Sequence, residues 1–214
     1  GVHTQMDKSL EASDIQPPQG VGQHQGLATP VSREQAGICV DRKIGTWNIS
    51  TINGKRAELE SFLRQTGTHL LALQETRRDS RNGWPIRLND FQIIESPADR
   101  EGDGHNGLAM CISNKLQGFE VGDVCAFTQL VQVSIDGAQW FVMNVYIPPA
   151  GEARKAALKA VQRRLEVARR HAFKEDLARI VILGDWNHSL EQLERTLQRW
   201  RATDLCVLKN NQGD

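Results

Sequence analysis

Three apolar runs of the sequence end in side chains that carry carboxylate or amide oxygens. Asn48 ends the first run, Glu75 follows the second, and Asp185 and Asn187 follow the third. In open α/β sheets, binding sites form just outside the carboxyl ends of the strands. Mg²⁺ is bound by one or two carboxylates and keeps several of its waters. The placement of these residues therefore predicts a site for a hard, oxygen-binding cation.

Each of these residues also has an ordinary structural interpretation. A glutamate that follows a strand, such as Glu75, is most often a solvated loop residue or a helix cap, and Asp185 is compatible with a simple turn. Tyr146 precedes an Ile-Pro-Pro segment and is compatible with packing under a loop. His188 is compatible with a position beside a helix start. The chemical interpretation rests on the combination of these residues and not on any one of them.

Apolar and alternating segments predict the strands that must carry these residues. The segment 130–146 is predicted to be a hairpin, because Asp136 and Gly137 form a type I′ turn signal between two alternating stretches. Its second strand must end at the two prolines that follow Ile147. The other predicted strands are 39–48, 69–74, 107–113 and 179–183, whereas 76–104 is polar and loop-rich apart from 91–94.

Helical periodicity predicts three helices between and after these strands. The first covers 55–65, and the second covers 152–174 with many basic residues between its apolar positions. Ser189 and Gln192 form a capping box that starts the third. Helix crossovers thus alternate with hairpin-linked strands, which predicts an α/β fold with helices outside and sheets packed inside.

Composition limits the class of protein. The 26 basic and 26 acidic residues cancel, which argues against a chain that coats DNA by its overall charge. A local basic face would still suffice for contact with phosphates. No apolar run approaches the ~20 residues of a membrane span, so no membrane partner is expected. The four cysteines fit no zinc-binding spacing, and Cys111, among apolar residues, is predicted to be a buried thiol.

Two regions are expected along the chain. Residues 1–38 are rich in Gln, Gly, Pro and Ser and lack apolar periodicity, which predicts a disordered tail or linker. Residues 39–214 are expected to form one domain.

Five segments, in this order and spacing, resemble the endonuclease/exonuclease/phosphatase superfamily, and most closely the endonuclease domain of non-LTR (LINE-type) retrotransposons. They read I-G-T-W-N-I-S-T-I-N-G-K-R-A-E-L-E-S-F-L, L-L-A-L-Q-E-T-R, G-L-A-M-C-I-S, N-V-Y-I-P-P and I-L-G-D-W-N. The resemblance covers roughly residues 40–208. It implies a DNase I-like, four-layer α/β sandwich, in which two packed mixed sheets are flanked by outer helices.

The resemblance also implies roles for individual residues. Asn48 matches the residue that shapes the metal and phosphate site, and Glu75 matches the principal metal-binding carboxylate. Tyr146 matches the hydroxyl that contacts the scissile phosphate. Asp185 matches the residue that orients or deprotonates the attacking water, and Asn187 matches the amide that steadies the pentavalent state. The implied cofactor is Mg²⁺, with Mn²⁺ as a substitute.

The sequence departs from the family pattern at two places. Ser50 stands where many members carry an acidic or amide residue. The family also ends with a Ser-Asp-His segment, after further strands, whose histidine is essential and whose aspartate supports the metal site. The sequence ends at Asp214 without this segment. We therefore expect a domain that lacks its last strands, is catalytically impaired and leaves a sheet edge uncovered.

Other residues do not replace that segment. Asp204, after the last helix, is expected to be structural. The chain's other candidate histidines do not occupy the family position: His69, His105, His171 and His188.

The resemblance predicts a nuclease that nicks target DNA and leaves a 3′-hydroxyl for reverse transcription. Its expected partners are DNA and a reverse transcriptase further along a polyprotein, inside the cell and in the nucleus of a eukaryotic host. Two alternatives remain open. One is a phosphomonoesterase or phospholipid-type phosphodiesterase of the same fold, and the other is a non-catalytic remnant or DNA-binding module. Basic residues of the second helix could contact phosphates or form a solvated face: Arg154, Lys155, Lys159, Arg163, Arg164, Arg169 and Arg170.

Overall fold

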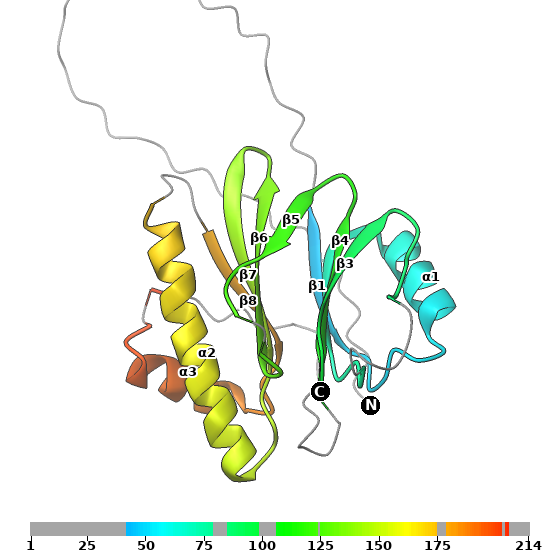
Figure 1. Cartoon of the computed structure of the whole chain (residues 1–214). Helices are drawn as coiled ribbons and strands as arrows, with labels where there is room; N and C mark the ends of the chain where they lie inside the picture. Colours follow the sequence, from blue (N-terminus) through cyan, green and yellow to red (C-terminus); the bar gives the residue numbers. More distant parts are fainter. Residues whose placement is uncertain are drawn as a thin grey trace, which may run out of the picture.

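The computed structural model describes residues 42–78, 85–98, 106–123, 125–174, 179–202 and 204–205. Two four-stranded sheets pack face to face, and helices cover their outer sides (Figure 1). The expected tail at 1–38, His105 and much of the loop 76–106 lie outside these residues. No helix within the described ranges is long and apolar enough to cross a membrane.

The first sheet has the strand order β1-β2-β4-β3. The strands β1 and β2 are parallel and are joined through helix α1, whereas β4 runs antiparallel to both β2 and β3. Helix α1 lies on the outer face of this sheet (Figure 1). The elements are β1 (Lys43–Asn48), α1 (Arg56–Thr66), β2 (Thr68–Gln74), β3 (Phe91–Ser96) and β4 (Leu108–Ser113).

The second sheet has the order β5-β6-β7-β8 and repeats the same mixture of directions. The strands β5, β6 and β7 are antiparallel, whereas β7 and β8 are parallel and are joined through α2. Helices α2 and α3 cover its outer face (Figure 1). The elements are β5 (Gln117–Glu120), β6 (Thr128–Ile135), β7 (Ala138–Tyr146), α2 (Gly151–Ala172), β8 (Arg179–Asp185) and α3 (Leu190–Arg199).

Alternation along β2 divides the core into layers. Leu71 and Leu73 pack toward α1, whereas Leu70 and Ala72 pack toward the second sheet. This follows from the two-residue period of a strand, which sends successive side chains to opposite faces. Both faces of this central strand are therefore covered, which explains why its sequence is a continuous apolar run.

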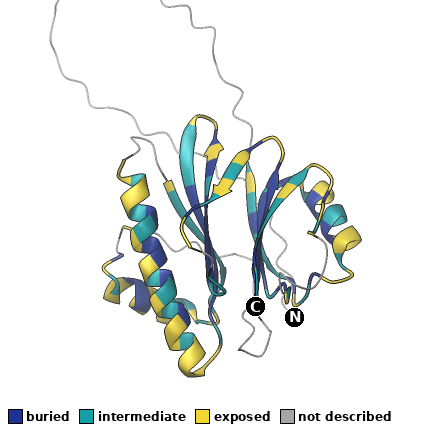
Figure 2. Ribbon diagram, viewed as in Figure 1, coloured by how far each residue is buried: buried dark blue, intermediate teal, exposed yellow. Residues whose placement is uncertain are grey.

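The strand β8 differs from the central strands because it forms an edge. All six residues of β4 are buried, but none of the seven residues of β8 is (Figure 2). Among the described residues, β8 pairs only with β7. Its other side has no strand partner within the part of the chain that the structure describes, and such an edge is a template for strand addition.

Most predicted elements are present, and the differences have physical reasons. Asp136 and Gly137 have φ angles of 49° and 79°, as a type I′ turn requires, and the Ser189–Gln192 capping box is formed. The strand β5 escaped prediction because its four residues alternate between exposed and half-buried and contain no apolar run. The first strand begins at Lys43, later than predicted, and α2 ends two residues earlier.

Candidate active site

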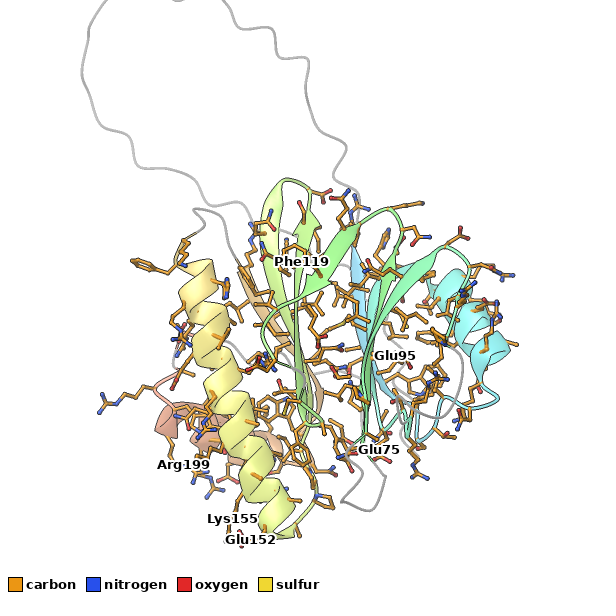
Figure 3. The ribbon with its side chains drawn as sticks, viewed as in Figure 1. Glu75, Glu95, Phe119, Glu152, Lys155 and Arg199 are labelled. Atoms are coloured by element: carbon orange, nitrogen blue, oxygen red, sulfur yellow. The ribbon has the colours of Figure 1, made fainter. Side chains whose placement is uncertain are left out.

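Both parallel strand pairs end at the same end of the sandwich. Asn48 pairs with Gln74 across β1 and β2, and Tyr146 pairs with Asp185 across β7 and β8. Because parallel strands share a direction, each pair places its carboxyl ends side by side. Figure 3 shows Glu75 there, on the side where α2 begins. The site is therefore assembled from four strand ends, two in each sheet.

The amide of Asn48 joins the two carboxylates of the site. Its Nδ2 donates to Glu75 Oε1 at 2.8 Å and to Asp185 Oδ2 at 2.9 Å. Its Oδ1 accepts from the backbone N–H of Ser50 at 3.1 Å, which orients the amide. Both carboxylates converge on one nitrogen atom, so they lie within reach of a single small ligand.

Tyr146 lies beside these carboxylates and is 7% exposed. Burial raises the pKa of its hydroxyl to about 12, with further contributions from the charge of Glu75, a hydrogen bond with that carboxylate and the charge of Asp185. The positive charge of Arg77 opposes these effects. The phenol therefore keeps its proton at neutral pH and can act as a hydrogen-bond donor.

Asp185 and Asn187 are not related as two residues of one strand. The strand ends at Asp185, and Asn187 adopts a φ of 43°. The backbone N–H of Asn187 donates to Asp185 Oδ1 at 3.0 Å, and its side-chain Nδ2 donates to Ile147 O at 2.9 Å. Trp186, between them, packs against the core under α2 and α3. Asn187 thus fixes Asp185 through its backbone and ties β8 to the end of β7.

Left-handed backbone occurs at two of the predicted site residues. Glu75 has a φ of 53° and Asn187 a φ of 43°. Residues other than glycine adopt this region at a cost, and such conformations cluster at functional sites. Glu75 directly follows strand β2, and Asn187 lies two residues after the end of strand β8. The chain therefore turns sharply just after each of these strands.

A buried polar network fastens the two sheets just behind the site. Gln74 Nε2 donates to Asn144 Oδ1 at 2.7 Å, and Asn144 Nδ2 donates to the carbonyls of Leu73 and Ala109 at 2.9 and 3.1 Å. Asn144 has no exposed surface, and Gln74 also bonds Thr46. Sequence reasoning missed this network. The sequence does contain a signal for it, because Gln74 and Asn144 are amide side chains within two largely apolar strands, β2 and β7.

Arg77 is a second residue that sequence reasoning missed. Its guanidinium lies 3.3 Å from Glu75 Oε2. The backbone N–H of Arg77 donates to Asn106 O and that of Thr76 to Gly107 O, which holds the turn after β2 against β4. The only sequence signal is a basic residue two positions after Glu75.

Gly184 allows β8 to approach β7 closely enough to bring Asp185 beside Tyr146. Its φ is 138°, and a Cβ atom there would lie 2.0 Å from the carbonyl oxygen of Val145. Such a contact is far inside van der Waals distance and involves backbone, which cannot move aside independently. The glycine of the Leu-Gly-Asp-Trp-Asn segment is therefore required by strand packing.

The donor set of the site suits a hard cation. Glu75 and Asp185 offer carboxylate oxygens that converge on the Asn48 amide. The described residues contain no group of three or more His, Cys, Asp or Glu side chains that could hold a metal. Two carboxylates are enough for Mg²⁺, which retains waters, but not for a closed zinc site, which needs four protein ligands.

Three other residues considered from the sequence, His69, Asp204 and Cys111, have structural surroundings. His69 is at the start of β2, where its Nδ1 accepts from the backbone N–H of Lys43 at 3.3 Å, and burial lowers its pKa. Asp204 forms an ion pair with Arg169. Both arrangements are structural. Cys111 is fully buried, as predicted.

Comparisons with known proteins place this geometry in context. The model of the endonuclease/exonuclease/phosphatase family matches residues 45–200. A search of curated proteins found no match.

Solved structures share the fold at low sequence identity. The endonuclease domain of TRAS1, a telomere-specific non-LTR retrotransposon, is 17% identical with a TM-score of 0.55, covering 75% of this chain and 71% of that one. The AP endonuclease LMAP from Leishmania major is 13% identical with a TM-score of 0.56, covering 80% and 72%. The Xenopus laevis APE2 catalytic domain is 19% identical with a TM-score of 0.54, covering 76% and 67%. With most of its length matched by the family model, the chain belongs to the endonuclease/exonuclease/phosphatase family.

Proposed function

We propose that this protein is a Mg²⁺-dependent phosphodiesterase that nicks DNA. The observation that carries the proposal is the convergence of Asn48 and Glu75 from one sheet with Asp185 and Tyr146 from the other. Two carboxylates joined by an amide, with a protonated phenol beside them, match the needs of phosphodiester hydrolysis. That reaction accumulates negative charge on the non-bridging oxygens, which a cation and preorganised donors stabilise.

Each side chain has a distinct task in this proposal. Asp185, held by Asn48 and by the backbone of Asn187, accepts the proton of the attacking water. Tyr146 retains its own proton and donates a hydrogen bond to the scissile phosphate. Glu75 is the principal residue that holds the cation, with Asn48 beside it. When bound, Mg²⁺ supplies positive charge to the phosphate oxygens and lowers the pKa of a coordinated water.

The amide of Asn187 has a task as well. In the free protein it donates to the carbonyl of Ile147, the residue that follows Tyr146 in the sequence. We propose that it turns toward the phosphate as charge develops there.

DNA is the proposed substrate because the fold is shared with AP endonucleases and with a retrotransposon endonuclease domain. We further propose that the chain is the target-site nuclease of a retroelement polyprotein, which would act in the nucleus of a eukaryotic host beside a reverse transcriptase. Residues 39–214 are proposed to form the nuclease domain.

A nicking assay tests the proposal. Supercoiled plasmid is incubated with excess protein in Mg²⁺, in Mn²⁺ and in EDTA, and inositol phosphates are tested side by side. We expect metal-dependent nicking that Asp185→Ala abolishes and that the exposed control Asp123→Ala leaves unchanged. Turnover of inositol phosphates without nicking would overturn the assignment of DNA as substrate.

The gene sequence beyond the codon for Asp214 provides an independent test. A Ser-Asp-His segment followed by reverse-transcriptase motifs would support the retroelement nuclease. A stop codon at that position would instead favour a non-catalytic remnant.

A further inference from the structure

A groove between α2 and α3 carries positive charge beside the candidate active site. Its volume is about 740 Å³, and the described residues that line it include three arginines and a histidine but no acidic side chain. Apart from these, polar and apolar side chains complete the walls. The lining residues are Arg154, Leu158, His188, Gln192, Arg195, Thr196, Gln198 and Arg199.

Arg154 forms the wall nearest the site. Its Nη1 donates to the carbonyl oxygens of Pro148 at 3.0 Å and Asn187 at 3.2 Å, and its Nη2 lies 2.9 Å from His188 Nδ1. The guanidinium therefore links the loop after Tyr146 to the loop after Asp185. The hydrogen-bond partners of Arg154 among the described residues are neutral carbonyls and an imidazole, so its charge is not balanced by a carboxylate there.

Arg195 and Arg199 form the opposite wall, one turn apart on α3. Arg195 pairs with Glu191 at 3.1 Å, but both side chains are more than 60% exposed, and such pairs are weak. Arg199 donates to the hydroxyl of Thr196 at 3.1 Å. Figure 3 shows Arg199 on the same side of the molecule as the first turn of α2. Both guanidinium groups remain available to an anion that enters the groove.

The other basic residues of α2 do not contribute in this way. Arg164 is buried and donates to the carbonyl of Val121, and Arg169 pairs with Asp204. Lys155 and Lys159 are exposed and are not among the residues that line the groove. Arg163 and Arg170 are exposed, but they lie about 160–180° around the helix axis from Arg154 because an α-helix turns 100° per residue. The positive charge of the groove is thus a local feature and not a property of the whole helix.

We propose that this groove binds the phosphodiester backbone of the nucleic-acid substrate, next to the phosphate that is cleaved. The proposal deepens, and rests on, the proposed nuclease function. Guanidinium forks match phosphate oxygens in geometry and charge, and phosphate contacts set the register of a protein on nucleic acid. Because Arg154 joins the groove to the backbone of Asn187, a strand held here would continue directly toward Asp185 and Tyr146.

A binding experiment separates this site from the chemistry. Anisotropy of a fluorescent DNA duplex is measured in EDTA, so that no turnover occurs, over a range of salt concentrations. The variant is Arg195→Gln/Arg199→Gln, and the matched control is Arg163→Gln/Arg170→Gln, which removes the same charge from the far face of α2. Arg154 is left unchanged because it also holds two loops together. Circular dichroism checks that both proteins are folded.

The groove variant should bind about tenfold more weakly near 0.1 M salt, and its slope of log K against log salt should fall by about one for each phosphate that the protein no longer neutralises. The control pair should change affinity less than about twofold by the same reasoning. Arg195→Lys/Arg199→Lys should recover most of the binding, because the charge is kept. Inorganic phosphate should compete only weakly, since it lacks the neighbouring phosphates of a strand.

The outcomes distinguish the two proposals. Equal loss of affinity in the groove and control variants, or no loss in either, would overturn the groove while leaving wild-type binding and nicking intact. Displacement of the duplex by submillimolar inorganic phosphate, about the range expected of a dedicated ion site, would also overturn it. A wild-type protein that neither binds nor nicks DNA would overturn the nuclease function and the groove together.

Discussion

Asn48 Nδ2 lies 2.9 Å from Asp185 Oδ2, although the two residues are 137 positions apart and belong to different sheets. The same nitrogen contacts Glu75 Oε1 at 2.8 Å. One amide therefore joins the carboxylates that the two halves of the sandwich contribute. Hydrogen bonds to charged groups are stronger than those between neutral groups, and this pair of hydrogen bonds orients both carboxylates.

Replacing Asn48 by alanine should separate these carboxylates. We expect Mn²⁺ affinity, measured from the free-ion signal in electron paramagnetic resonance, and the nicking rate to fall about 10- to 100-fold, as for other groups that orient metal ligands. Asn53→Ala, in the exposed turn that follows, is the matched control and should leave both unchanged. Unaltered Mn²⁺ affinity in Asn48→Ala would show that this amide does not organise the site.

The pKa of Tyr146 can be read directly because it is the single tyrosine in the sequence. The absorbance of the phenolate band is measured after rapid pH jumps, before the protein unfolds. It should titrate with a midpoint of about 12 in the folded protein and near the ordinary value of 10.0 in denaturant. Glu75→Gln removes a negative charge that disfavours the phenolate, so the folded midpoint should move down toward 10.0. The exposed Glu166→Gln should not move it.

The same shift has a consequence for stability. A pKa raised in the folded state means that the folded protein holds its proton more tightly than the unfolded chain. The corresponding stability is complete below pH 10 and is lost as pH rises through about 12. Burial likewise raises the pKa of Cys111 from 9.0 to about 12, so stability should begin to fall above pH 9. Urea midpoints that stay constant from pH 8 to pH 11 would contradict this, given linkage of about 1.4 kcal/mol per pKa unit.

Asn144 should contribute to stability mainly through its hydrogen bonds between the two sheets. Asn144→Ala removes three buried hydrogen bonds between the sheets and leaves a gap behind the site. We expect a loss of about 2–4 kcal/mol in the free energy of unfolding, measured by urea denaturation with tryptophan fluorescence. Gln139→Ala, on the same strand but only half-buried, should cost less than about 1 kcal/mol. If the two variants were equally stable, the network would not fasten the sheets.

Gly184 should tolerate no side chain. Gly184→Ala places a Cβ atom against the backbone of Val145, so we expect destabilisation of about 3 kcal/mol or more, or failure to fold. Gly54→Ala provides the comparison, because its φ is 75° but a Cβ there meets no atom within 4 Å. This variant should lose only the free energy of unfolding that a left-handed backbone costs an alanine, about 1–2 kcal/mol. Thermal melting of both variants distinguishes the two effects, and a mild effect at Gly184 would show that β8 can shift away from β7.

Several elements could be read from local sequence because their cause is local. The hairpin at Asp136-Gly137 and the helix start at Ser189 depend on turn and capping chemistry within a few residues. The central strand β2 shows its burial as an unbroken apolar run. Strand β5 has no such signature, because a half-exposed edge strand of four residues is determined by its partner β6 and not by its own composition.

The sequence alone determined which residues stand at the strand ends, since each apolar run stops at a polar side chain: Asn48, Glu75, Tyr146 and Asp185. Only the tertiary structure decided that these ends meet, because register and sheet packing depend on contacts between residues far apart in the chain. It also decided the direction of the chain at Asn187, since a left-handed residue just after a strand redirects the backbone. The Gln74–Asn144 bridge and the arginine groove likewise exist only where distant segments pack together.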